Sequence, residues 1–146
     1  MLHHRLYKYL ISPADKSKLI FDEENNVLNG YLGFKLSEDR FFNETKWERN
    51  LEGQLILEAG CGSGRFMEHA VKTGADVISF DYSNAVEANY KSNGNNKNLL
   101  IIQANIFNMP FKDNTFDKVF CFGMLQHTPN PKKAFFELIR VLKTGG

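Results

Sequence analysis

Residues 55–65 read Leu-Ile-Leu-Glu-Ala-Gly-Cys-Gly-Ser-Gly-Arg. The apolar run at Leu55–Leu57 predicts a short buried strand, and the apolar spacing from Arg65 to Lys72 predicts a helix. Gly60, Gly62 and Gly64 lie between the two. Glycines let a backbone turn sharply and let a ligand approach closely. A strand that runs through such a loop into a helix is the context of a nucleotide-binding site.

On either side of this loop, apolar runs alternate with helical patterns. Further strands are predicted at 77–80, 99–103 and 117–122. Gly74 is placed to end the first helix, and Ser83 to cap a second that runs to Lys91. Asn130 and Pro131 begin a third helix, with Phe135, Leu138, Ile139 and Leu142 on its apolar face. Strands separated by helices predict an α/β fold with a mainly parallel sheet and right-handed crossovers.

Polar residues follow the predicted strands, where open parallel sheets bind ligands. Glu58 ends the first strand, Asp81 the second, and Asn105 follows the third. The segment after Phe122 follows the fourth. A carboxylate at Asp81 can accept hydrogen bonds from both ribose hydroxyls of an adenosine.

Two kinds of adenosine ligand are compatible with this loop. A dinucleotide requires G-x-G-x-x-G, but here the third glycine, Gly64, comes one residue early. Glu58 would also repel a pyrophosphate, whereas it would attract the sulfonium and ammonium of S-adenosylmethionine (SAM). SAM is therefore favoured over NAD, and an NAD-dependent oxidoreductase is the disfavoured alternative.

The segment 57–66 resembles motif I of class I SAM-dependent methyltransferases, and Asp81 matches their ribose-binding acid. Segments 107–117, 125–131 and 140–146 also resemble this family. The resemblance implies a Rossmann-like, doubly wound sheet with strand order 3-2-1-4, with SAM as cofactor and S-adenosylhomocysteine (SAH) as product. It implies cofactor contacts from Glu58, Ala59, Gly60, Cys61, Gly62, Ser63, Gly64, Asp81, Tyr82, Asn105, Ile106, Phe122 and Gly123. Where the family usually has Asp, this chain has Asn105, whose amide oxygen can accept the same hydrogen bond or simply shape the turn.

The candidate for a catalytic role is His127, since its ordinary pKa suits a general base. The alternative is that His127 orders the loop after the fourth strand. Tyr82 is expected to pack on the adenosine. Cys61 and Cys121 are interpreted as small buried residues and not as nucleophiles, and no metal site is predicted.

Residues 1–50 are predicted to form an N-terminal segment distinct from the core at 51–146. Residues 18–21 and 27–32 flank a polar turn at 22–26, which suggests a hairpin, and residues 40–50 suggest a lead-in helix. Compared with the family pattern, the sheet is expected to lack its C-terminal strands, so the chain is expected to be a fragment. The free edge of the fourth strand is then expected to pair with a second copy or to be covered by residues 1–50.

The 146 residues have a net charge of +1 and no basic stripe, so nucleic acid is not an expected partner. No apolar run is long enough for a membrane span, and two distant cysteines favour the cytoplasm. The expected function is methyl transfer from SAM to a small-molecule acceptor. A SAM-binding regulatory or partner module without catalysis is the alternative.

Overall fold

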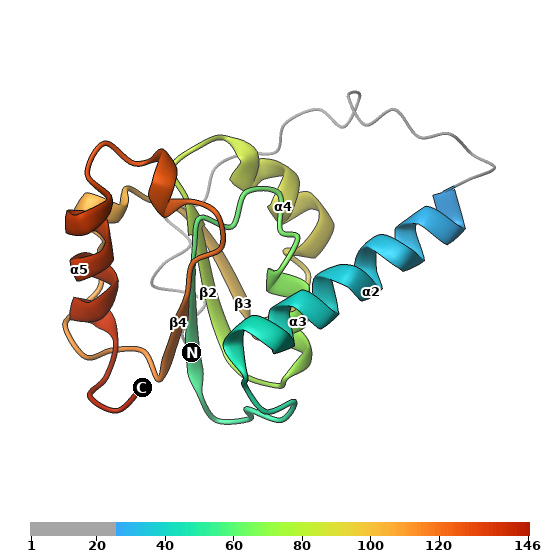
Figure 1. Cartoon of the computed structure of the whole chain (residues 1–146), viewed down its shortest axis with the longest axis horizontal. Helices are drawn as coiled ribbons and strands as arrows, with labels where there is room; N and C mark the ends of the chain where they lie inside the picture. Colours follow the sequence, from blue (N-terminus) through green and yellow to red (C-terminus); the bar gives the residue numbers. More distant parts are fainter. Residues whose placement is uncertain (1–25) are drawn as a thin grey trace.

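The computed structural model describes residues 26–146, with side chains from residue 35 onward. Its centre is a parallel sheet in the order β3-β2-β1-β4 (Figure 1), which confirms the predicted strand order. The strands are β1 (Leu55–Ala59), β2 (Asp76–Asp81), β3 (Leu99–Gln103) and β4 (Lys118–Phe120). Because all four run the same way, their carboxyl ends lie at one edge of the sheet.

Helices cover both faces of the sheet (Figure 1). One face carries α2 (Asn26–Thr45), α3 (Met67–Lys72) and α4 (Ala85–Asn93), and the other carries α5 (Pro131–Val141). Phe41 of α2 is completely buried and packs edge-on against Phe120 of β4, with ring centroids 5.2 Å apart. Burial on both faces explains why the strands read as continuous apolar runs.

The predicted hairpin near the N-terminus is wrong where it can be compared with the structure. Residues 27–32, expected as its second strand, belong to α2, whereas residues 18–21 lie outside the described part of the chain. Val27, Leu28, Tyr31 and Leu32 recur at helical spacing, and this periodicity prevails over the hairpin interpretation. The predicted helix at 40–50 is also corrected, because α2 begins earlier and ends at Thr45.

Several element boundaries differ from the sequence predictions. The fourth strand is limited to Lys118–Phe120, and α3 begins at Met67. The N-cap position of α4 falls on Asn84, one residue after the predicted Ser83, although the Ser83 hydroxyl accepts from the backbone N–H of Ala85 at 3.3 Å. The cap of α5 is confirmed, since the Asn130 side chain accepts from the backbone N–H of Lys133 and Pro131 opens the helix.

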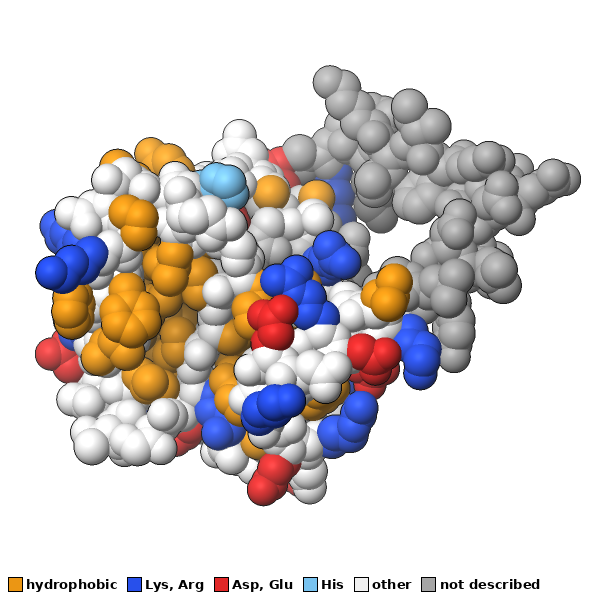
Figure 2. All heavy atoms as spheres, viewed as in Figure 1, with side chains coloured by type: hydrophobic (Ala, Val, Ile, Leu, Met, Phe, Trp, Pro, Cys, Tyr) orange, Lys and Arg blue, Asp and Glu red, His pale blue; other side chains and the backbone are white. Residues whose placement is uncertain are grey.

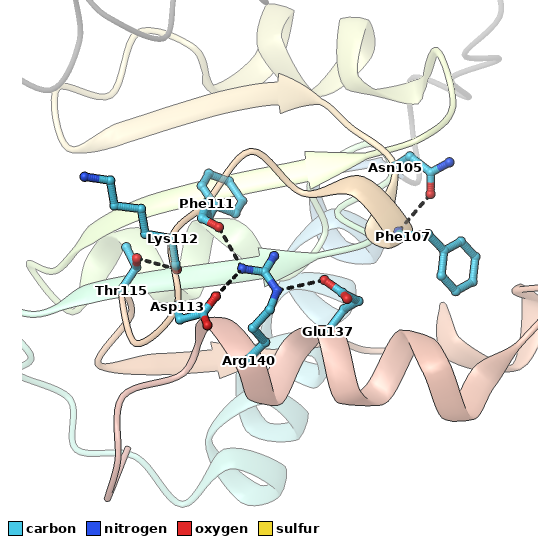
Figure 3. A network of polar contacts seen from close by, with 8 residues as sticks. All are labelled: Asn105, Phe107, Phe111, Lys112, Asp113, Thr115, Glu137 and Arg140. Carbon is cyan, nitrogen blue, oxygen red and sulfur yellow. Dashed lines mark hydrogen bonds and ion pairs between the residues drawn. The ribbon is translucent and has the colours of Figure 1, made fainter.

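The loop before β4 is fastened to α5 through Arg140 (Figure 3). The Arg140 guanidinium donates to the Phe111 carbonyl and to Asp113 Oδ1, each at 2.8 Å, and to Glu137 Oε2 at 2.9 Å. The chain after α5 also returns to this loop, since Phe116 pairs with Leu142 in a parallel bridge. Two of the segments that carry the family resemblance, 107–117 and 140–146, therefore meet in space.

Within residues 26–146, no helix is both long enough and apolar enough to cross a bilayer.

Candidate cofactor site

A cavity of about 330 Å³ opens at the carboxyl ends of β1, β2 and β3. The sequence-predicted site residues Gly60, Asp81, Tyr82, Asn105, Ile106 and His127 all line it. They come from four separate segments, which the parallel topology brings to one edge of the sheet. The sheet thus brings these six residues to one cavity.

Other predicted residues lie outside the lining of this cavity. They are Glu58, Ala59, Cys61, Gly62, Ser63, Gly64, Phe122 and Gly123. Ala59 is completely buried in the core. Phe122 packs edge-on against Phe66, with ring centroids 4.9 Å apart, on the sheet face that carries α2 and α3.

Six lining residues were not singled out from the sequence. They are Phe80, Ala104, Phe107, Met124, Thr128 and Pro129. Phe107, Thr128 and Pro129 belong to the segments that resemble the family, whereas each of the other three is adjacent in sequence to a predicted site residue. Their side chains carry no distinctive chemistry, and only the folded arrangement shows that they form a largely apolar wall.

Asp81 lies at the end of β2, and both of its carboxylate oxygens are held by backbone and side-chain donors. Oδ2 accepts from the Gly62 N–H at 2.9 Å, while Oδ1 accepts from the Ser83 N–H at 2.8 Å and the Ser83 hydroxyl at 2.7 Å. A carboxylate offers about four acceptor positions. Asp81 can therefore fix the glycine loop and still accept a hydrogen bond from a ligand hydroxyl.

Asn105 follows β3 and shapes the next turn. Its Oδ1 accepts from the backbone N–H of Phe107 at 2.9 Å, which caps the short 3-10 helix at Ile106–Asn108 (Figure 3). The side chain is exposed and lines the cavity. It can therefore shape the turn and also present amide groups to a ligand.

The loop after β4 approaches the glycine loop closely at Gly60. A Cβ at this position would lie 2.5 Å from Cβ of Met124. Gly60 also has φ of +82°, which favours glycine. Glycine is thus required here both by backbone conformation and by the close approach of Met124, which lines the cavity.

Glu58 is buried beside the loop, on the sheet face opposite Leu57 and Ala59. Its carboxylate accepts a hydrogen bond from the hydroxyl of Ser79, its partner on β2. Burial raises the pKa of Glu58 to about 7, although the Ser79 hydrogen bond opposes this shift. Near neutral pH this carboxyl can therefore exist in either protonation state.

Neither cysteine is an activated thiol. Burial raises the pKa of Cys61 to about 12 and also raises the pKa of Cys121. A thiol is a weak nucleophile when its pKa lies well above neutral. Both cysteines remain interpreted as small residues of the loop and the core.

His127 ends a short 3-10 helix, Leu125–His127, and its side chain is exposed at the cavity. Its backbone N–H donates to the Met124 carbonyl at 3.0 Å. His127 therefore shares a cavity with Asp81 and Asn105.

These features suit a nucleoside. An apolar wall matches the faces of a base, while Asp81 and Asn105 supply hydrogen-bonding groups. The residues present therefore fit the nucleoside half of SAM.

Comparison with known proteins identifies the family of the chain. Residues 57–146 match the model of a family described as a methyltransferase domain. Two relatives are a sterol 24-C-methyltransferase of Pneumocystis carinii and a tRNA U34 carboxymethyltransferase of Proteus mirabilis. The first is 35% identical over 101 residues, which are 65% of this chain and 26% of the relative. The second is 35% identical over 115 residues, 71% of this chain and 35% of the relative.

A solved structure of a SAM-dependent methyltransferase from Aquifex aeolicus has the same fold, with a TM-score of 0.63 and 21% identity. The match covers 85% of this chain and 69% of that structure. The chain spans about a quarter to a third of the length of the two relatives named above. The family match covers more than half of the chain, and the chain therefore belongs to the methyltransferase domain family, whose methyl donor is SAM.

Proposed function

We propose that this chain binds SAM in the cavity at the carboxyl ends of β1, β2 and β3 and supports methyl transfer to a small-molecule acceptor. The observation that carries the proposal is the meeting of Gly60, Asp81 and Asn105 around one apolar cavity. Asp81 would hold the ribose, and Asn105 would meet the adenine. Ile106 and Tyr82 would pack on the base.

SAM supplies an activated methyl group on a sulfonium, so the reaction needs alignment and exclusion of water more than acid–base chemistry. The glycine loop would lie along the amino-acid half of the cofactor. Glu58, in its charged form, would favour the positive charges of SAM. His127 would close the cavity or remove a proton from the acceptor, and these two roles predict different kinetics.

The choice of a small molecule rests on the chain itself. Its net charge of +1 reflects no excess of basic side chains of the kind that favours nucleic-acid binding. The relatives do not decide the acceptor, because one is named for a sterol and another for a tRNA. The alternative function is a SAM-binding module without catalysis, which would bind the cofactor equally well and show no transfer.

Calorimetry with SAH and with NAD tests the cofactor assignment. We expect SAH to bind and NAD to bind more weakly. Tighter binding of NAD would contradict the proposal. A screen of acceptors with labelled SAM then separates an enzyme from a binding module.

A further inference from the structure

Asn89, on α4, carries a completely buried amide near the glycine loop. Its Oδ1 accepts from Nδ2 of Asn93 at 3.0 Å. Its own Nδ2 makes no regular hydrogen bond to the described residues, and the Cys61 thiol is the weak acceptor left to it. A buried N–H group with so weak an acceptor destabilises the folded protein. A polar residue kept at such a position calls for an explanation beyond packing.

The amide of Asn89 lies against the last glycine of the loop. A Cβ at Gly64 would lie 2.3 Å from Oδ1 of Asn89 and 2.7 Å from Nδ2 of Asn93. Gly64 also has φ of +96°, so this position strongly favours glycine. The absence of a side chain at Gly64 lets the loop rest directly on the two amides of α4.

Asn89 also lies near the beginning of the loop. The Cys61 thiol is close enough for the Asn89 amide to favour its thiolate form, although burial dominates the pKa of Cys61. The middle of the loop is held from another direction, because the Gly62 N–H donates to Asp81. Residues 61–64 are therefore supported by β2 on one side and by α4 on the other.

We propose that Asn89 is a positioning residue that holds residues 61–64 in the conformation that binds the cofactor. This inference rests on the proposed function. Asn89 acts through the loop, since it lies outside the lining of the cavity. A loop that is already ordered loses less entropy when a ligand binds, so its support contributes to affinity.

The test is Asn89→Leu, which has a similar shape and no polar atoms. The variant removes a poorly paired donor and also the acceptor of Asn93 Nδ2, so the two effects on stability oppose each other and the thermal midpoint should change little. Without the Asn89 amide, we expect the loop of the variant to adopt the binding conformation for only about a tenth of the time. The affinity of the variant for SAH, measured by calorimetry, should then be about tenfold lower than that of the original chain. The amide NMR signals of Gly62 and Gly64 should shift as well. Val86→Ala, at another buried position of α4, is the control and should lower the midpoint while leaving affinity unchanged.

Equal SAH affinity in Asn89→Leu and the original chain would overturn the inference. If Asn89→Leu does not fold, Asn93→Ala replaces it, because Asn93 is only half-buried and donates to Asn89. Weaker SAH binding by Asn93→Ala would support the inference, and unchanged binding would overturn it. If the original chain itself does not bind SAH, the proposed function fails instead.

Discussion

The backbone N–H of Gly62 donates to Oδ2 of Asp81 at 2.9 Å and thereby ties the glycine loop to the end of β2. The residue expected to bind the ribose is thus also the residue that orders the loop. Both contributions are lost together when the carboxylate is removed. Asp81 is therefore the most informative single position of the site.

Asp81→Ala should weaken SAH binding by at least about tenfold, since one charge-assisted hydrogen bond is worth roughly 1.5–3 kcal/mol and 1.4 kcal/mol is a factor of ten. Calorimetry measures the change. Asp76→Ala is a matched control, because Asp76 is exposed at the opposite end of β2. Unchanged affinity in a folded Asp81→Ala protein would show that the ribose is held elsewhere.

The buried carboxyl of Glu58 should make cofactor binding depend on pH. Its pKa is raised to about 7 in the free protein, and the positive charges of SAM would lower it. SAM affinity should therefore rise as the pH approaches 7 and level off above about 7. Glu58→Gln should remove most of this rise. An identical pH profile in both proteins would exclude Glu58 as the titrating group.

The same carboxyl should affect stability in a defined pH window. Its pKa is higher in the folded protein than the ordinary value of 4.5, so the folded state binds more protons between about 4.5 and 7. The contribution of Glu58 to the free energy of unfolding should fall as pH rises through this window. Chemical denaturation of the original chain and of Glu58→Gln at several pH values measures the difference. A parallel stability profile in the two proteins would contradict this prediction.

His127→Ala should weaken SAH binding, because His127 lines the same cavity as Asp81 and Asn105. If His127 is instead a general base, turnover should fall roughly 10²–10⁴-fold while SAH affinity is nearly intact. Calorimetry and turnover at saturating SAM separate the two roles. His127→Gln keeps a polar side chain and should preserve more affinity than His127→Ala if the role is to close the cavity.

Arg140→Ala should lower the free energy of unfolding by roughly 1–3 kcal/mol, because it leaves the Phe111 carbonyl and Glu137 without this donor. The ion pair between Arg140 and Asp113 adds little to the free energy of unfolding, because the Asp113 carboxylate is exposed to solvent. Denaturant titration measures the change. Lys132→Ala is the control, since Lys132 is exposed on the same helix. Equal stability of the two variants would show that the Arg140 contacts do not fasten the loop.

Much of this arrangement could be predicted because several signals agreed. Glycine spacing, apolar runs and the position of Asp81 all depend on local patterns, and parallel topology then brings the strand ends together. The role of Glu58 was harder to predict, because a strand buried on both faces hides the alternation that would place its side chain in the interior. Met124 could not be predicted at all, since its contact with Gly60 depends on two loops that meet only in the folded chain.

The outer edge of β4 leads to the last prediction. Among the described strands, β4 pairs only with β1. On its other side the bridge from Leu142 reaches Phe116, which lies before the first residue of β4. Hydrophobic side chains gather over neighbouring α5, where Phe135, Phe136 and Ile139 are about half exposed (Figure 2).

An unpaired, apolar strand edge tends to pair with another chain. We expect this chain to dimerise through the β4 edge, and multi-angle light scattering over a range of concentrations measures its mass. Val119→Lys places a charge on β4, a common natural protection of such edges, and should shift the protein to monomer. Lys97→Glu, two residues before β3 at the opposite edge of the sheet from β4, is the control and should leave the dimer intact. A monomer at every concentration, or a dimer that Val119→Lys leaves unchanged in a folded protein, would show that this edge is not the interface.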